Sequence, residues 1–259
     1  MNCETESVVT CLQLRERIIP AFEKAHGPEY QALFMVDNSQ GHSAYPADAL
    51  LAQRMNLGPG GKKPCMRDGW FMREDQKVSH SMVMPSTSDG SPQLKGMQMV
   101  LEERGLWPRG GLRLKCPKSS CNPEATACCA TRLISLQPDF LEQKSLVQET
   151  IENAGHLCIF LPKFHCELNF IEFFWGAVKR YLREHCDYSY DGLRTNLPDA
   201  LASVDISTIR KWEHHMIRWM DAYRGGKDAK EAQIEVKKFS SRKYTSHRRI
   251  PEGVAAALD

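Results

Sequence analysis

Two carboxylates stand at positions where proteins with parallel sheets often place their chemistry. Asp37 directly follows an apolar run at residues 32–36, and open parallel sheets bind ligands beyond the C-terminal ends of their strands. Glu172 falls in the first turn of a predicted helix. Both residues also have a local explanation, since Asp37 can cap a turn and Glu172 can complete a capping box with Asn169. Two interpretations therefore stay open, a pair of catalytic acids or two structural roles.

A second group of chemistry-bearing residues is a set of four cysteines within a short segment: Cys116, Cys121, Cys128 and Cys129. Four thiolates are a common ligand set for structural Zn²⁺. The spacing is irregular, because zinc sites usually contain pairs of cysteines two to four residues apart, and adjacent cysteines do not easily bind one ion. We keep two interpretations, a zinc site and ordinary free or buried thiols.

Basic residues gather in two places that could contact phosphate groups. Three of them follow Glu172 along the same predicted helix: Lys179, Arg180 and Arg183. Six more lie in residues 236–251, which contain no acidic residue: Lys237, Lys238, Arg242, Lys243, Arg248 and Arg249. Either set suits a nucleic-acid backbone, and either could instead be a solvated surface.

The hydrophobic pattern predicts the elements that must position these side chains. Apolar runs at residues 32–36 and 157–161 predict two buried strands of the kind found in parallel sheets. Helical periodicity predicts helices over these segments: 12–25, 46–57, 95–104, 141–153, 171–185, 191–203 and 206–224. Helices that alternate with buried strands indicate an α/β fold.

The distribution of residue types divides the chain into five parts. Residues 58–135 carry many glycines and prolines and half of the ten cysteines, which predicts an irregular, cysteine-rich insertion. The other parts are a first and a second part of a catalytic-like core, a helical extension and a basic tail: residues 1–57, 136–190, 191–235 and 236–259.

The overall composition excludes several classes of protein. With 42% hydrophobic and 25% charged residues among 259, the chain is neither disordered nor collagen-like. No apolar stretch approaches the roughly 20 residues that a membrane span needs, and the N-terminal residues do not resemble a secretory signal. The net charge of +2 means that a nucleic-acid surface must come from local clustering. We expect a cytoplasmic or nuclear protein with reduced cysteines.

Two motifs in the correct order resemble a known family. Residues 161–180, LPKFHCELNFIEFFWGAVKR, resemble the mariner-like DDE transposase signature of L-P, a five-residue loop, L-N-P-I-E, and then W and K-R along a helix. Residues 37–42, DNSQGH, resemble the D-N-x-x-x-H of the same superfamily. The resemblance covers about residues 30–57 and 136–185. It implies a ribonuclease-H-like fold in which Asp37 and Glu172 are the second and third catalytic acids.

The resemblance also implies metal-dependent chemistry on DNA. Hard oxygen ligands suit Mg²⁺ or Mn²⁺, and two such ions would stabilise the attacking and leaving oxygens of strand cleavage and transfer. DNA would be the partner, with self-association of the chain as a further expectation and no membrane involved. The expected location is the nucleus, otherwise the cytoplasm.

The chain departs from the family pattern in ways that bear on activity. Phe170 replaces the usual proline, Glu167 stands where the family has aspartate, and a long insertion separates the two acids. No aspartate precedes Asp37, so the first catalytic acid is missing. We therefore expect a truncated core, the C-terminal part of a transposase-like protein, that is inactive as this chain. The alternative is a non-catalytic nucleic-acid-binding module that uses the basic tail.

Overall fold

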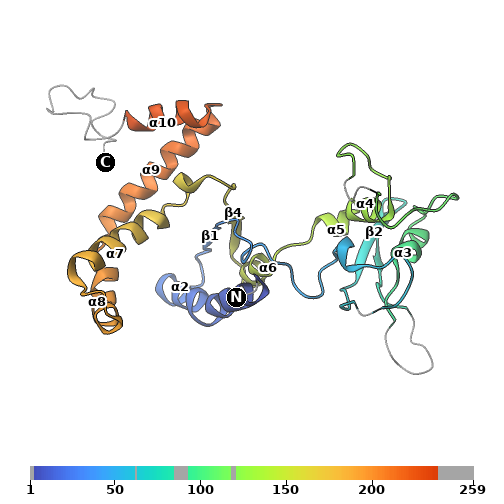
Figure 1. Ribbon diagram of the computed structural model, residues 1–259, viewed down its shortest axis with the longest axis horizontal. Helices are drawn as coiled ribbons and strands as arrows, with labels where there is room; N and C mark the ends of the chain where they lie inside the picture. The colour runs from blue at the N-terminus through green and yellow to red at the C-terminus, as the bar shows by residue number, and fades with distance from the viewer. Residues whose placement is uncertain (1–2, 62, 85–92, 118–120, 239–259) are drawn as a thin grey trace. The chain divides into compact units, whose positions relative to one another are not determined.

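The computed structural model describes residues 3–61, 63–84, 93–117 and 121–238 (Figure 1). The protein is mixed α/β and contains a small two-stranded parallel sheet. The chain divides into two compact units. Unit 1 comprises Met1–Phe34 and Ser39–Cys158, and unit 2 comprises Met35–Asn38 and Ile159–Asp259.

The two predicted strands pair with each other. β1 (Leu33–Val36) and β4 (Leu157–Phe160) run parallel. The N–H of Leu161 donates to the carbonyl oxygen of Val36 over 2.8 Å, and an equivalent bond lies at the start of the pair. The expectation of a parallel sheet is therefore confirmed.

The expected burial of these strands is wrong. Leu33 is 54% exposed and Leu157 is 49% exposed, and the burial pattern of both strands mixes exposed with half-buried positions. Parallel strands read as continuous apolar runs when helices cover both faces of the sheet and neighbouring strands cover both edges. Here the sheet consists of two strands, so part of its apolar surface stays in contact with solvent.

The N-terminal helix is longer than its hydrophobic pattern predicts. α1 (Cys3–Gln13) continues through a π-helical turn at Leu14–Ile18 into α2 (Ile19–His26). Pro20 explains the turn, because proline has no N–H to donate and its ring clashes with the carbonyl one turn earlier. Gly27, with φ of +85°, ends the helix in a conformation that glycine adopts readily.

The helix before β4 has clear start and stop signals. α6 (Leu146–Asn153) begins at Ser145, whose hydroxyl accepts from the N–H of Gln148 over 3.1 Å. It ends at Asn153, and Gly155, two residues later, has a φ of +84°. α6 packs against α1 within unit 1, and it occupies most of the segment predicted at residues 141–153.

Residues 58–135 contain more regular structure than expected. β2 (Gly69–Arg73) and β3 (Gln76–His80) form an antiparallel hairpin. α3 (Met97–Glu103) is the one helix predicted in this region, and α4 (Ala130–Ser135) and the short α5 (Pro138–Leu141) follow it.

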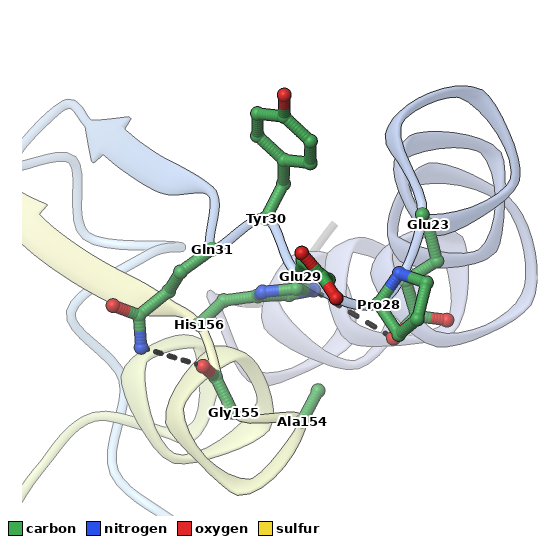
Figure 2. A pocket seen from close by; sticks show the side chains of 9 residues that line it. Glu23, Pro28, Glu29, Tyr30, Gln31, Ala154, Gly155 and His156 are labelled. Carbon is green, nitrogen blue, oxygen red and sulfur yellow. Dashed lines mark hydrogen bonds and ion pairs between the residues drawn. The ribbon is translucent and has the colours of Figure 1, made fainter.

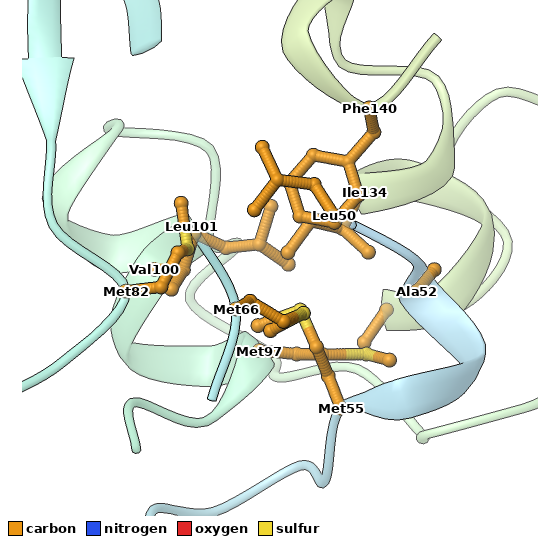
Figure 3. Close-up of a cluster of buried hydrophobic side chains, with 11 residues drawn as sticks. Leu50, Ala52, Met55, Met66, Met82, Met97, Val100, Leu101, Ile134 and Phe140 are labelled. Atoms are coloured by element: carbon orange, nitrogen blue, oxygen red, sulfur yellow. The ribbon is translucent and has the colours of Figure 1, made fainter. Parts of the chain in front are cut away.

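These elements enclose a hydrophobic core, drawn in Figure 3. Its buried members come from the segments before and after the hairpin in the sequence. They are Leu50, Ala52, Met55, Met66, Met82, Met97, Val100, Leu101, Ala130, Ile134 and Phe140. The four methionines suit this role, because an unbranched thioether adapts to irregular gaps between short elements.

The helix predicted over residues 46–57 is wrong. The segment contains a single 3₁₀ turn, Ala52–Arg54, although its apolar side chains do reach the core. Side chains satisfy the backbone instead of helical bonds: Arg54 donates to the carbonyl of Pro46, and the N–H of Leu50 donates to Gln143. Apolar spacing alone could not distinguish a buried loop from a helix here.

A buried ion pair links two elements of this core. Arg104 at the end of α3 makes two bonds of 2.8 and 2.7 Å to Asp139 in α5, and both side chains are at most 1% exposed. Asp139 also accepts from the N–H of Trp70, and Arg104 donates to His80. Every charged atom of the pair therefore has a partner, as burial requires.

Unit 2 consists mostly of helices that the periodicity predicts. α7 (Ile171–His185), α8 (Tyr190–Ala202) and α9 (Ile206–Arg224) match the expected segments within one residue. α10 (Ala229–Lys237) was not predicted. α7 lies against α8, and α9 against α10 (Figure 1).

The core of unit 2 forms around α9 and the loop that follows β4. Leu161, Leu168 and Met216 are buried, and five further side chains pack against them: Met35, Phe170, Trp219, Met220 and Tyr223. None of the helices in the described residues is long and apolar enough to cross a bilayer.

Breaking the buried ion pair should destabilise unit 1 strongly. Asp139→Ala leaves Arg104 buried without its partner, so we expect the free energy of unfolding to fall by about 3–5 kcal/mol. Replacing both residues, Arg104→Met with Asp139→Leu, should recover much of that loss, because no unpaired charge is left. Urea denaturation followed by circular dichroism measures both variants, and equal losses in the two would contradict this account.

Candidate functional site

The four cysteines of the insertion converge in space. The Sγ atoms of Cys116, Cys121, Cys128 and Cys129 all lie within 4.8 Å of one another. The Sγ of Cys121 lies 3.8 Å from that of Cys116 and 3.8 Å from that of Cys129. In the described part of the chain, this is the only group of three or more His, Cys, Asp or Glu side chains arranged to hold a metal ion.

The start of α4 positions one end of this cluster. Cys129 is the N-cap residue of α4, and its sulfur accepts from the N–H of Arg132 over 3.4 Å. The guanidinium of Arg132 donates to the carbonyls of Ala125 and Pro123. It thereby fixes the loop that leads into the last two cysteines.

The thiols influence one another's ionisation. Hydrogen bonding to Cys128 and burial raise the pKa of Cys116 and of Cys121. Burial opposes ionisation of Cys129 as well, but hydrogen bonds from the backbone of Arg132 and from the other thiols outweigh it and lower the pKa of that group. Cys129 therefore loses its proton more readily than Cys116 or Cys121 does.

The irregular spacing of the cysteines does not keep them apart. The sulfurs of the adjacent residues Cys128 and Cys129 both lie within 4.8 Å of those of Cys116 and Cys121, so the four thiols gather at one place despite their spacing. Cys129 has an extended backbone, with φ of −161° and ψ of +166°, immediately before the helix.

The two predicted catalytic acids both belong to unit 2 and are exposed. Asp37 follows the last residue of β1. Glu172 is the second residue of α7. The expected capping box between Asn169 and Glu172 is wrong, because the helix begins after Phe170 without a side-chain cap. Its carboxylate is therefore not used to cap the helix. Neither acid belongs to a group of three or more metal-type ligands in the described residues.

The predicted phosphate-binding residues are only partly placed. Lys179, Arg180 and Arg183 are exposed on α7, in the helix that carries Glu172. Lys237 and Lys238 are exposed at the end of α10. The other four predicted residues lie outside the described part of the chain: Arg242, Lys243, Arg248 and Arg249.

Comparisons with known proteins do not identify a relative. No family model, no curated protein and no solved structure matches this chain significantly.

A polar pocket in unit 1 was not predicted. Figure 2 shows His156 directed toward Glu23, with 3.8 Å between Nε2 of the imidazole and Oε1 of the carboxylate. The pocket encloses about 500 Å³ and is also lined by the loop of residues 27–31. His156 is far from that loop in sequence, so only the pairing of β1 with β4 could have indicated this contact.

A hydrogen-bonded glutamate in unit 2 was also not predicted. Oε1 of Glu167 accepts from the hydroxyl of Tyr223 and contacts Nδ1 of His165, both over 2.7 Å. Burial would raise the pKa of Glu167, but these hydrogen bonds outweigh burial and lower it. Burial and the glutamate raise the pKa of Tyr223 to about 12. Glu167 therefore ties the loop before α7 to α9.

The contribution of this contact to stability should depend on pH. Because the folded pKa of Glu167 lies below its usual value of 4.5, the stabilisation is complete above that value and is lost as pH falls through the lowered pKa. At pH 7, Tyr223→Phe should cost about 1.5–3 kcal/mol, the range for a hydrogen bond to a charged group.

The measurement is thermal unfolding of the wild type and Tyr223→Phe between neutral and strongly acidic pH. The stability difference between them should shrink in acid, whereas Tyr190→Phe, at an exposed tyrosine, should show no difference at any pH. A Tyr223→Phe deficit that stays constant down to pH 3 would contradict the assigned role of Glu167.

Proposed function

We propose that Cys116, Cys121, Cys128 and Cys129 bind one Zn²⁺ ion. The observation that carries this proposal is the spacing of the sulfurs. A tetrahedral site with zinc–sulfur bonds of about 2.3 Å has sulfurs about 3.8 Å apart, and Cys121 lies 3.8 Å from two of its neighbours. Soft thiolate ligands favour zinc over Mg²⁺ or Mn²⁺.

The role of this ion would be structural. Four protein ligands fill a tetrahedral coordination sphere and leave no position open for water or substrate. The described residues between α3 and α4 contain neither helix nor strand, so no regular ladder of backbone hydrogen bonds holds them. A metal that joins Cys116 and Cys121 to Cys128 and Cys129 would add order to the part of this segment nearest α4.

Removal of one ligand should abolish tight zinc binding. We expect one zinc per wild-type chain by elemental analysis, and a loss of affinity of roughly 100-fold or more for Cys121→Ser, since even indirect partners of a metal contribute 10–100-fold. Zinc removal should also lower the melting temperature of the wild type.

Cys65→Ser is the matched control, because Cys65 is a free, exposed cysteine of the same unit. It should retain one zinc per chain. A wild-type chain without zinc, or a Cys121→Ser variant that binds zinc as tightly as the wild type, would contradict the proposal.

We further propose that the chain derives from a DDE transposase and binds DNA in the nucleus. Supporting this is the placement of the two acids. β1 and β4 are parallel neighbours, so their C-terminal ends lie at the same edge of the sheet. Asp37 is the first residue after β1 and therefore lies at that edge. Glu172 lies in the helix that follows β4, with its carboxylate free of any capping bond.

The same resemblance argues against strand cleavage by this chain alone. Residues 1–36 contain no aspartate, and the two acids have no third ligand of metal type among the described residues. Two divalent ions need a bridging ligand to be held close together. With two carboxylates, Mg²⁺ or Mn²⁺ would bind weakly, and binding of DNA would remain as the function.

The alternative proposal is that the basic tail, residues 236–259, binds the nucleic acid. A non-catalytic nucleic-acid-binding module could use Lys237, which is exposed at the end of α10. Lys238 fits this role less well, because its ammonium group bonds to Glu235 over 2.8 Å.

Supercoiled plasmid tests the absence of cleavage. With Mg²⁺ or Mn²⁺ present, the wild-type chain should nick plasmid no faster than Asp37→Ala or Glu172→Ala, because the metal site lacks its first acid. Gel electrophoresis measures the nicked fraction. Nicking that is lost in both variants, but kept in the Glu184→Ala control on the same exposed helix, would show an active site and contradict this proposal.

A further inference from the structure

We propose that the segment leading into the cysteine cluster, residues 106–116, binds the phosphate backbone of duplex DNA. We call it the basic segment. Arg109, Arg113 and Lys115 lie on it and are exposed. The sequence contains no acidic residue from 105 to 123. The inference rests on the zinc site proposed above, because that site would fix one end of the segment.

The backbone of the basic segment is held by the start of α4. The carbonyl of Arg113 accepts from the N–H of Ala130 over 2.9 Å, and the carbonyl of Leu114 accepts from the N–H of Thr131 over 3.1 Å. The hydroxyl of Thr131 adds a bond of 2.6 Å to Leu114. These donors directly follow Cys129, so the segment and the cysteine cluster form one structural element.

Apolar contacts hold the other end. Trp107 and Leu112 pack against the hydrophobic core of unit 1, and a turn closed by Gly111 N–H and the carbonyl of Pro108 lies between them. The backbone is thus anchored at several points while its cationic side chains extend into solvent. A preorganised surface of this kind loses little conformational entropy when it binds.

The charges of the basic segment are not neutralised within the described structure. Arg109, Arg113 and Lys115 form no ion pair with any described residue, whereas Arg67 of the same unit pairs with Asp48 and Glu149. Arginine presents a planar fork that matches phosphate oxygens, and lysine presents a point charge. Three such contacts to a DNA backbone would be independent of sequence and sensitive to salt.

The test measures binding of the zinc-loaded full chain to two unrelated fluorescent duplexes by anisotropy over a range of salt concentrations. The triple variant Arg109→Ala, Arg113→Ala, Lys115→Ala should bind both duplexes at least tenfold more weakly. Loss of three phosphate contacts should reduce the slope of log K against log salt by about 2.7, at about 0.9 per contact.

A charge-matched control uses three cations that are already paired: Lys144, Arg210 and Arg224. Changing all three to alanine alters the net charge equally and should leave the slope unchanged. Zinc content is measured in every variant. A triple variant that keeps its zinc and binds like the control overturns the inference. So does binding that is lost only when residues 239–259 are removed, which assigns DNA binding to the tail.

The outcomes separate this inference from the zinc proposal. A wild-type chain without zinc contradicts the metal site itself. If the triple variant still loses its binding in that case, the basic segment stands as a DNA surface without a metal.

Discussion

The close approach of four sulfur atoms is the constraint on which the proposed zinc site depends. Thiolates within 4.8 Å of one another repel, and hydrogen bonding to Cys128 together with burial raises the pKa of Cys116 and of Cys121. A divalent cation removes this repulsion and uses all four ligands at once. The loop before α4 would then be held by metal–sulfur bonds in addition to its backbone hydrogen bonds.

Pairing of β1 with β4 is the second constraint, and it determines which distant residues meet. It brings the end of α6 to the loop after α2, which creates the pocket of His156 and Glu23. At the other end of the strands it places Asp37 and the chain leading to Glu172 at one edge of the sheet. The positions of the polar residues that flank the strands thus depend on the pairing of only eight strand residues.

The sequence predicted elements well where their signals were local. α8 and α9 begin at Ser189 and Asp205, whose side chains accept from helical N–H groups, and their apolar periodicity is long. α10 was missed although its capping box of Asp228 and Glu231 could be recognised in the sequence. The β2–β3 hairpin was missed for a physical reason. Its turn places Glu74 and Asp75 at positive φ, where glycine or asparagine is the usual signal.

The candidate site was predicted in its residues but not in its geometry. The four cysteines were recognisable by type, yet only the structure shows that the adjacent pair shares a centre with Cys116 and Cys121. The hydrogen bonds that order the neighbouring loop, such as those from Arg132 to two backbone carbonyls, cannot be recognised from residue spacing or composition. Long-range hydrogen bonds of this kind depend on the fold around them, and no local pattern encodes them.

X-ray absorption at the zinc edge of the purified full chain tests the central claim most directly. The account predicts four sulfur scatterers at about 2.3 Å, in a sample that contains one zinc per chain. A first shell of nitrogen or oxygen, or fewer than three sulfurs, would show that the cysteine cluster does not hold the metal and would contradict the account.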